Sequence, residues 1–518
     1  MNSTESPAKV NPWLIALSVM LATFMEVLDT SIANVSLRHI AGSLSVSTDE
    51  STWVLTTYLI SNAIVIPSTA WFGQRFGRKR FLLTCVAIFT TASFLCGVAT
   101  SLPMLLAMRI LQGAGGGALQ PIAQSILLES FPKEKHGQAM GVYGLGVVTA
   151  PILGPVLGGW ITDNYSWRWI FFINVPVGIV AMMLMQRFIH DPHWIRNAKP
   201  PRLDVIGFSF MSLWLGCQEV LLDKGQEDDW FGSRFIILMT VLAVTGFAAF
   251  LWRALRTPKP FVDLRVLKNF NFSLGLGLMF SAGITLYSLT AIIPLFLQSL
   301  MGYTALQSGY AMIPRGLGAL IAMPLAGKLV SKIQARYLVA GGFLSFGAAA
   351  LAMAHLSLDL SPWILFWPLF FSGVAIAFMF VPLNTIALGS LKPEQIGNAS
   401  GIFNLMRNVG GSVGISMVTT LVARSAQAHQ STLAAHLTPY DTTVQSSLHT
   451  LTAAFSATSG SATASQQAVG SLYHTLVTQA NLLAYLDNFR GFAVLCFVCI
   501  LGALFLKKVK VHGPIAAH

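Results

Sequence analysis

The chain has 518 residues, of which 54% are hydrophobic and only 10% are charged. Soluble domains carry about 25% charged residues, so this composition excludes the two or three soluble domains that such a length suggests. The formal net charge is +12, but the basic residues are distributed by membrane side, which excludes a nucleic-acid-binding surface as their purpose.

Hydrophobic stretches recur along the whole chain, and each is long enough to cross a hydrocarbon core of about 30 Å as a helix. They contain Gly and Pro freely, which membrane helices tolerate. The predicted fold class is therefore an all-α membrane protein. Its fourteen predicted spans are 13–35, 52–73, 81–101, 104–128, 138–161, 169–189, 204–222, 235–252, 272–297, 306–330, 337–356, 362–388, 399–423 and 489–506.

Lys and Arg gather on one side of these spans. If the chain starts inside, the segments 75–80, 187–202 and 253–268 carry many of the bases and fall in the cytoplasm. This positive-inside pattern predicts an inner-membrane, multi-pass protein with both termini cytoplasmic and with bases near anionic lipid. The first span is too long for a signal peptide and is predicted to be a retained helix.

Two basic linkers, 190–203 and 253–271, divide the spans into six, two and six. The predicted domains are an N-terminal six-helix lobe at 1–200, a two-helix insert at 201–258 and a C-terminal six-helix lobe at 259–518.

The C-terminal lobe includes a predicted outer loop, 425–487, which is rich in Ser, Thr, Ala and Gln and holds no Lys or Arg. Part of it has helical spacing. That helix either lies on the membrane or on its own loop, or it offers a docking surface for a periplasmic partner. The residues of its apolar stripe are Val469, Tyr473, Leu476, Ala480 and Leu483.

Span one carries two acidic residues, Glu26 and Asp29, which share a helix face because they are three positions apart. A charge at bilayer depth costs roughly 2.5–3.5 kcal/mol on insertion scales, so both groups must face protein or a watery cavity. Such a carboxyl can load and release protons as access alternates. Both are candidate proton-coupling residues; the alternative is a structural hydrogen bond to a neighbouring helix.

Three arginines also lie within predicted spans. Arg109 in span four needs a carboxylate or backbone carbonyls as partners, so it either belongs to the proton-coupling site or ties two helices together. The glycines after it lack the strand that a dinucleotide motif requires, and they predict close helix packing. Arg315 and Arg407 either pair across the lobe interface or meet substrate, and both possibilities stay open.

Span five reads GVYGLGVVTAPILGPVLGGW. Its small residues predict close packing, and its two prolines predict a kink with a mechanical role. The residues of this motif are Gly146, Pro151, Gly154, Pro155, Gly158 and Gly159.

The short loop after span two combines glycines with bases. Gly73 and Gly77 predict a tight turn between spans two and three, while Arg75 and Arg78 set the topology. We treat this segment as a candidate gating loop.

Aromatic residues within the spans suit a broad apolar pocket for lipophilic substrates, although most membrane aromatics serve packing. Together with the two arginines of the second lobe, they make up the candidate substrate cavity. Its members are Trp53, Tyr58, Tyr143, Tyr287, Arg315, Phe403 and Arg407.

The chain contains neither GxxxxGK[ST] nor HExxH. An ATP motor, a metal cofactor and an enzymatic activity are therefore not expected. A proton gradient is the expected energy source.

Together, these segments resemble the fourteen-span drug:proton antiporters of the major facilitator superfamily, and among them the EmrB-type multidrug exporters, over essentially the whole chain. LDTSIANVSL at 28–37 is similar to the span-one motif, with Asp29 as its Asp, and RILQGAGGG at 109–117 is similar to the span-four motif. GVVTAPILGPVLGG at 146–159 resembles the span-five antiporter motif. The superfamily usually carries Gly and Asp where Ala70 and Gln74 stand, which argues against a charge relay through that loop.

This resemblance implies two lobes that rock around a central cavity and couple proton uptake to drug export. It also implies an EmrA-type periplasmic membrane-fusion adaptor and a TolC-type outer-membrane channel, with 425–487 as a candidate docking region. One alternative is a narrow exporter of a metabolite, fatty acid or siderophore on the same fold. A second is a membrane sensor or scaffold that transports nothing.

Overall fold

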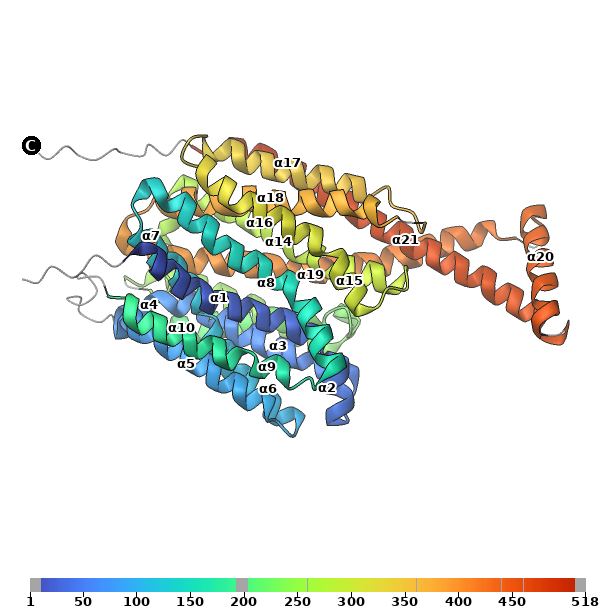
Figure 1. Cartoon of the computed structure of the whole chain (residues 1–518), viewed down its shortest axis with the longest axis horizontal. Helices are drawn as coiled ribbons and strands as arrows, with labels where there is room; N and C mark the ends of the chain where they lie inside the picture. Colours follow the sequence, from blue (N-terminus) through green and yellow to red (C-terminus); the bar gives the residue numbers. More distant parts are fainter. Residues whose placement is uncertain are drawn as a thin grey trace, which may run out of the picture.

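The computed structural model describes residues 11–191, 204–258, 260–359, 361–438, 440–459 and 461–507. These residues are helical and include no strand, because apolar segments in lipid must satisfy their backbone hydrogen bonds internally. The helices lie side by side in a bundle, with α1 (Pro12–Val35) beginning and α21 (Ser461–Leu504) ending at the same end (Figure 1). We call this the terminal end, and the opposite one the arm end.

The helices before residue 192 form the first group of the bundle. They are α1, α2 (Leu37–Leu44), α3 (Thr48–Val65), η1 (Ile66–Ser68), α4 (Thr69–Phe76), α5 (Arg78–Gly97), α6 (Leu102–Gly116), α7 (Leu119–Ser130), η2 (Lys133–Lys135), α8 (His136–Asn164), α9 (Trp169–Phe172) and α10 (Asn174–Phe188). Within the group, α1 packs against α8 and α10, and α6 packs against α3 and α5.

Two helices, α12 (Val205–Lys224) and α13 (Arg234–Arg256), follow as a pair joined through η3 (Trp230–Gly232). We call this pair the accessory hairpin. Its first helix contacts α3 of the first group and α19 of the last group as well as α13. The hairpin therefore bridges the two halves of the bundle along one side.

The remaining helices form the second group. They are η4 (Leu264–Lys268), α14 (Phe270–Ser299), α15 (Ala305–Ala311), α16 (Ile313–Leu329), α17 (Ala335–Met353), α18 (Pro362–Gly389), α19 (Pro393–His436), α20 (Thr442–Ser459) and α21. Among them, α14 packs on α19, and α18 packs on α16 and α17.

Eleven helices of the described chain are long and apolar enough to cross a membrane. The other three predicted spans are helical but differ in detail. Span 104–128 is divided into α6 and α7, and span 306–330 into α15 and α16, which leaves α16 with 17 residues. Span 399–423 lies within α19, which carries Asn, Ser, Thr and Arg along much of its length. Fourteen crossings therefore stay a prediction.

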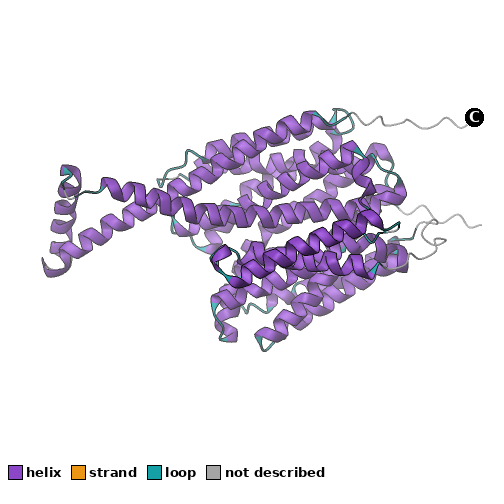
Figure 2. Ribbon diagram, turned by 180° about the vertical axis from the view of Figure 1, so that it is seen from behind, coloured by secondary structure: helices purple, strands orange, loops and turns teal. Residues whose placement is uncertain are grey.

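The predicted outer loop, 425–487, is largely helical, which confirms the helix expected at 469–483 and extends it over most of the segment. The helices α19 and α21 have 44 residues each, which corresponds to about 66 Å and exceeds a hydrocarbon core of about 30 Å. Both continue beyond the bundle, and α20 crosses at their tip (Figures 1 and 2). Of the predicted apolar stripe, Leu476 and Ala480 are buried, whereas Val469 and Tyr473 are exposed. We call this projection the arm.

The two groups meet directly along α8 and α16, where small residues allow their backbones to approach. A methyl group on Gly141 would lie 2.8 Å from the carbonyl oxygen of Met323, and one on Gly327 would lie 2.6 Å from the carbonyl oxygen of Gly137. Such close approach is the usual role of glycine between membrane helices. This close approach places α8 at the interface between the first and the second group.

Candidate functional site

Asp29 of α1 and Arg109 of α6 form an ion pair inside the first group. The Arg109 Nη1 atom lies 2.6 Å from Asp29 Oδ2, and both side chains are at most 1% exposed. The amides of Gln112 and Asn174 each donate to Asp29 Oδ1 at 2.8 Å. Arg109 also donates to the carbonyl of Val54 at 3.0 Å. This carboxylate is thus neutralised and hydrogen-bonded on both oxygens.

Glu26, one turn earlier on α1, has a different environment. Its carboxylate accepts hydrogen bonds from the amides of Gln120 at 2.7 Å and Asn62 at 3.2 Å, and from the hydroxyl of Tyr58 at 3.5 Å. It forms no ion pair within the described part of the chain. Glu26 and Asp29, which the sequence analysis treated alike, therefore differ in their electrostatic environment. Within the described residues, Asp29 has a counter-ion and Glu26 has none.

The glycine run after Arg109 brings α6 against α3 and α1. A methyl group on Gly113 would lie 2.4 Å from the carbonyl oxygen of Tyr58. One on Gly116 would lie 2.7 Å from the Tyr58 hydroxyl and 3.2 Å from Cγ of Glu26. Only glycine leaves room for these two side chains, so the run positions Glu26 and its neighbours.

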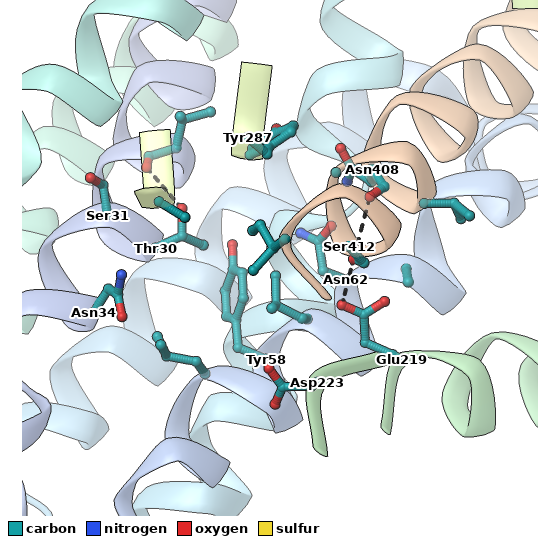
Figure 3. A pocket seen from close by; sticks show the side chains of 18 of the residues that line it. Thr30, Ser31, Asn34, Tyr58, Asn62, Glu219, Asp223, Tyr287, Asn408 and Ser412 are labelled. Atoms are coloured by element: carbon teal, nitrogen blue, oxygen red, sulfur yellow. Dashed lines mark hydrogen bonds between the residues drawn. The ribbon is translucent and has the colours of Figure 1, made fainter. Parts of the chain in front are cut away.

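A cavity of about 320 Å³ lies between the two groups and the accessory hairpin. It is lined by side chains of α1, α3, α7, α8, α12, α14 and α19. Asn34 and Asp223 line it near the arm-directed ends of α1 and α12, which places the cavity toward the arm end. Figure 3 shows labelled side chains of α1, α3, α12, α14 and α19 arranged around it.

The cavity contains some of the predicted residues and several that sequence reasoning missed. Glu26, Tyr58, Tyr287 and Pro151 line it, whereas Trp53, Tyr143, Phe403, Arg315 and Arg407 are not among its lining residues. The missed residues are polar: Asn62, Gln120, Gln218, Glu219, Asp223, Asn408 and Ser412. Glu219 was detectable by the same rule that selected Glu26, an acid within an apolar span, whereas Asp223 lies one residue beyond the predicted span 204–222.

The two second-lobe arginines have different partners. Arg407 of α19 donates to the Gln120 carbonyl oxygen at 2.5 Å, so it reaches across to the first group. Arg315 of α16 donates to the Thr290 hydroxyl at 2.8 Å and to the Leu286 carbonyl at 3.0 Å, both on α14. Of these two arginines, Arg407 alone contacts the opposite half of the bundle. Its partner there, Gln120, also donates to Glu26.

A second polar contact joins the halves one turn further toward the terminal end. The amide of Asn404 donates to the Gln124 carbonyl oxygen at 2.7 Å, and the hydroxyl of Ser400 donates to the same oxygen at 2.9 Å. All three side chains are buried. Together with the packing of α19 on α4 and η1, these bonds close the terminal end below the cavity.

The span-five motif joins α8 to α1. Pro155 has no N–H, so the carbonyl of Pro151 loses its helical partner. The hydroxyl of Ser31 donates to that carbonyl at 3.1 Å, and Gly154 leaves the space that Ser31 occupies. Gly146 and Gly158 face Met20 and Ile32 of α1, whereas Gly159 faces open space.

Of the candidate gating loop, Gly77 forms the turn between α4 and α5, whereas Gly73, predicted to belong to that turn, and Arg75 lie within α4. Gly77 has φ of 85°, a conformation that favours glycine. Arg78 is buried and forms an ion pair of 2.5 Å with Glu129 at the end of α7, while Arg75 is exposed. Gly73 is buried and lies close to Arg78. The loop thus ties α5 to the terminal end of α7.

Comparison with known sequences identifies a matching family model and relatives that are similar over most of the chain. Residues 19–415 match the family model of the Major Facilitator Superfamily. The chain is 35% identical to the fatty acid resistance protein FarB of Neisseria gonorrhoeae, over 97% of each chain. It is 34% identical to the multidrug export protein EmrB of Escherichia coli K12, over 96% of this chain and 95% of the relative.

Solved structures with the same fold are more distant in sequence. The proton:xylose symporter XylE aligns with a TM-score of 0.61 at 13% identity, over 96% of each chain. The human organic anion transporter MFSD10 aligns with a TM-score of 0.58 at 13% identity, over 95% of this chain and 99% of the other. These two similarities support the fold alone.

Proposed function

The chain belongs to the major facilitator superfamily, and from this premise we propose that it is a proton-coupled antiporter that exports hydrophobic compounds by alternating access. Family membership makes it a membrane transporter rather than an enzyme. Relatives named as multidrug exporters, similar over most of the chain, support the outward direction of transport.

The observation that carries this proposal is Glu26, a carboxyl without a counter-ion in the described structure, on the wall of the central cavity. A proton or a ligand that enters the cavity reaches it directly. Its neighbours are neutral amides and a hydroxyl, which can hold either protonation state. Glu26 is therefore our candidate for the group that loads the proton.

Gln120 is the candidate for coupling that proton to movement. Its amide N–H donates to Glu26, while its carbonyl oxygen accepts from Arg407 of the opposite half. A protonated Glu26 would accept a weaker hydrogen bond from Gln120, because a bond to a charged acceptor is about twice as strong as a neutral one. Protonation then loosens the hydrogen-bonded link from Glu26 through Gln120 to Arg407 and favours separation of the two halves.

Asp29 and Arg109 have a supporting role in this scheme. Their ion pair lies outside the cavity lining and fixes α1 against α6, one turn from Glu26. We retain both as proton-coupling residues, since a charge change at Glu26 alters the field at Asp29 across a single helical turn.

The arm supports the further proposal of a tripartite pump. We place the protein in the inner membrane with cytoplasmic termini, which puts the arm in the periplasm. There it would contact an EmrA-type membrane-fusion adaptor, with a TolC-type outer-membrane channel completing the path. Pull-down of an adaptor by the full chain, and its loss when 440–460 is replaced by a short linker, tests this assignment.

The deciding experiment is export by purified protein in liposomes. An imposed proton gradient should drive transport of a lipophilic dye, and Glu26→Gln should abolish that transport while leaving the protein folded. Asp29→Asn should also impair export. Asp163→Asn, which changes an exposed carboxyl, is the matched control. Dye movement that ignores the proton gradient would overturn the proposal.

A narrower exporter on the same fold is the second candidate, because one relative of this length is named a fatty acid resistance protein. A resistance panel separates the two. Protection against several unrelated lipophilic toxins supports the broad exporter, whereas protection against fatty acids alone supports the narrow one.

A further inference from the structure

The accessory hairpin contributes acidic groups to the cavity. Gln218, Glu219 and Asp223 of α12 all line it, as does Glu26 of α1. Figure 3 shows Glu219 and Asp223 on this one helix, with Glu219 facing Ser412 and Asp223 near Tyr58. An element outside the two groups of the bundle therefore forms one wall of the cavity.

Glu219 is buried with little to balance its charge. The side chain is 6% exposed, and its Oε1 atom accepts one hydrogen bond, of 2.8 Å, from the Ser412 hydroxyl. In the part of the chain that the structure describes, its other oxygen has no hydrogen-bond partner and neither oxygen has an ion-pair partner. A buried carboxylate in this state is costly unless a cation joins it or it takes up a proton.

Among the described residues no cation pairs with Glu219, although the Nε and Nη1 atoms of Arg407 have no hydrogen-bond partner there. Lys224 forms an ion pair of 2.6 Å with Glu227, and Arg407 donates to Gln120 and Asn408. Asp223 accepts from the Thr56 hydroxyl rather than from a base. The residues that line the cavity include three carboxyl groups and no Lys, Arg or His.

The rest of the lining suits an apolar body attached to a cationic group. Val27, Leu55, Leu59, Leu215, Val409 and Ile415 supply the apolar surface. Tyr287 supplies an aromatic ring, and Gly411 gives that ring room, since a methyl group there would lie 2.5 Å from it. Aromatic rings and carboxylates together are the usual recognition elements for organic cations.

We infer that Glu219, with Asp223 nearer the arm end, binds the positively charged group of a lipophilic organic cation, such as an amine or a quaternary onium ion. This inference rests on the proposed export function and specifies its substrate class. The accessory hairpin then has a role in substrate selection. Anions of the same shape bind worse, because they meet carboxylates without a compensating base.

The test compares two ions of nearly equal size and shape. Tetraphenylphosphonium carries a positive charge and tetraphenylborate a negative one, and neither can exchange a proton. Equilibrium dialysis against the full chain in lipid nanodiscs, corrected by empty nanodiscs, measures binding without any proton gradient. We expect saturable binding of tetraphenylphosphonium and at least tenfold weaker binding of tetraphenylborate.

Glu219→Gln should weaken tetraphenylphosphonium binding at least tenfold, with little change for tetraphenylborate. Glu219→Asp should retain part of the affinity, and Asp163→Asn all of it. Asp223→Asn, nearer the arm end, should give a smaller loss, and it provides a second variant if Glu219→Gln fails to fold.

Several outcomes separate this inference from the proposed function. Equal binding of the two ions overturns the inference. So does a folded Glu219→Gln variant that binds tetraphenylphosphonium normally but no longer exports dye, because Glu219 would then carry protons instead. Glu219-dependent binding in a protein that ignores the proton gradient would support the inference while overturning the proposed antiport.

Discussion

At the scale of single residues, the buried pair of Asp29 and Arg109 has the largest energetic consequence. Removing one partner of a buried ion pair leaves an uncompensated charge, which typically costs 3–5 kcal/mol. We expect Arg109→Gln and Asp29→Asn each to lower the melting temperature of the purified protein clearly. The double variant should recover much of this loss, because neither charge then remains.

A double-mutant cycle from thermal denaturation in detergent measures this coupling. Lys328→Gln, at the terminal end of α16, provides a control that removes a charge outside this pair. Single variants that melt like the wild type would contradict the prediction, as would a double variant with the summed loss of both.

The charged members of the site were predictable from sequence, while the neutral side chains that hydrogen-bond to them were not. Glu26, Asp29 and Arg109 stand out because a charge within an apolar span is costly and therefore serves a purpose. Gln120, which links Glu26 to the other half, is a neutral amide in an apolar helix and gives no such signal. Its importance depends on a contact with Arg407 that is 287 positions away.

At the scale of elements, the packing of α8 on α1 depends on which face of α8 each glycine occupies. A methyl group on Gly154 would lie 2.2 Å from the Ser31 hydroxyl, whereas one on Gly159 meets nothing within 4 Å. Overpacking a tight contact typically costs 1–3 kcal/mol. Gly154→Ala should therefore lower both the melting temperature and proton-driven export.

Gly159→Ala is the matched control, since the same substitution in the same helix should be neutral or slightly stabilising. Ser31→Ala is an independent check, because it leaves the Pro151 carbonyl without its donor. If alanine at both glycine positions had the same effect, the contact with α1 would not be the reason for the motif.

Apolar stretches predicted the membrane helices well where packing surrounds a helix with apolar neighbours, as in α14 and α18. They predicted poorly where a helix leaves the bundle. The arm is rich in Ser, Thr and Gln, which reads as a loop, yet α20 and α21 pack on each other and remain helical. Packing between whole helices, α20 on α21 and α19 on α21, stabilises the arm, and the composition of a short segment does not reveal that packing.

At the scale of the whole molecule, the described arrangement has a cavity toward the arm end and a closed terminal end. The closure consists of Gln124 with Ser400 and Asn404, and of α4 packed on α19. Alternating access requires these contacts to break in each cycle. The sequence predicted two lobes from its linkers, but which end is closed follows only from contacts across the interface.

The closed end offers a direct test of this movement. A Cβ atom on Gly397 of α19 would lie 3.9 Å from Cβ of Ala70 on α4, within the usual range of about 3.5–4.5 Å for a disulfide. Ala70→Cys/Gly397→Cys, with the five native cysteines replaced by alanine or serine, should form a cross-link on oxidation. We expect the cross-link to abolish proton-driven export and reduction to restore it, because the two halves can no longer separate at the terminal end. As a control, the single-cysteine variants should export normally under both oxidising and reducing conditions. Undiminished export by fully cross-linked protein would mean that substrate does not enter between α4 and α19.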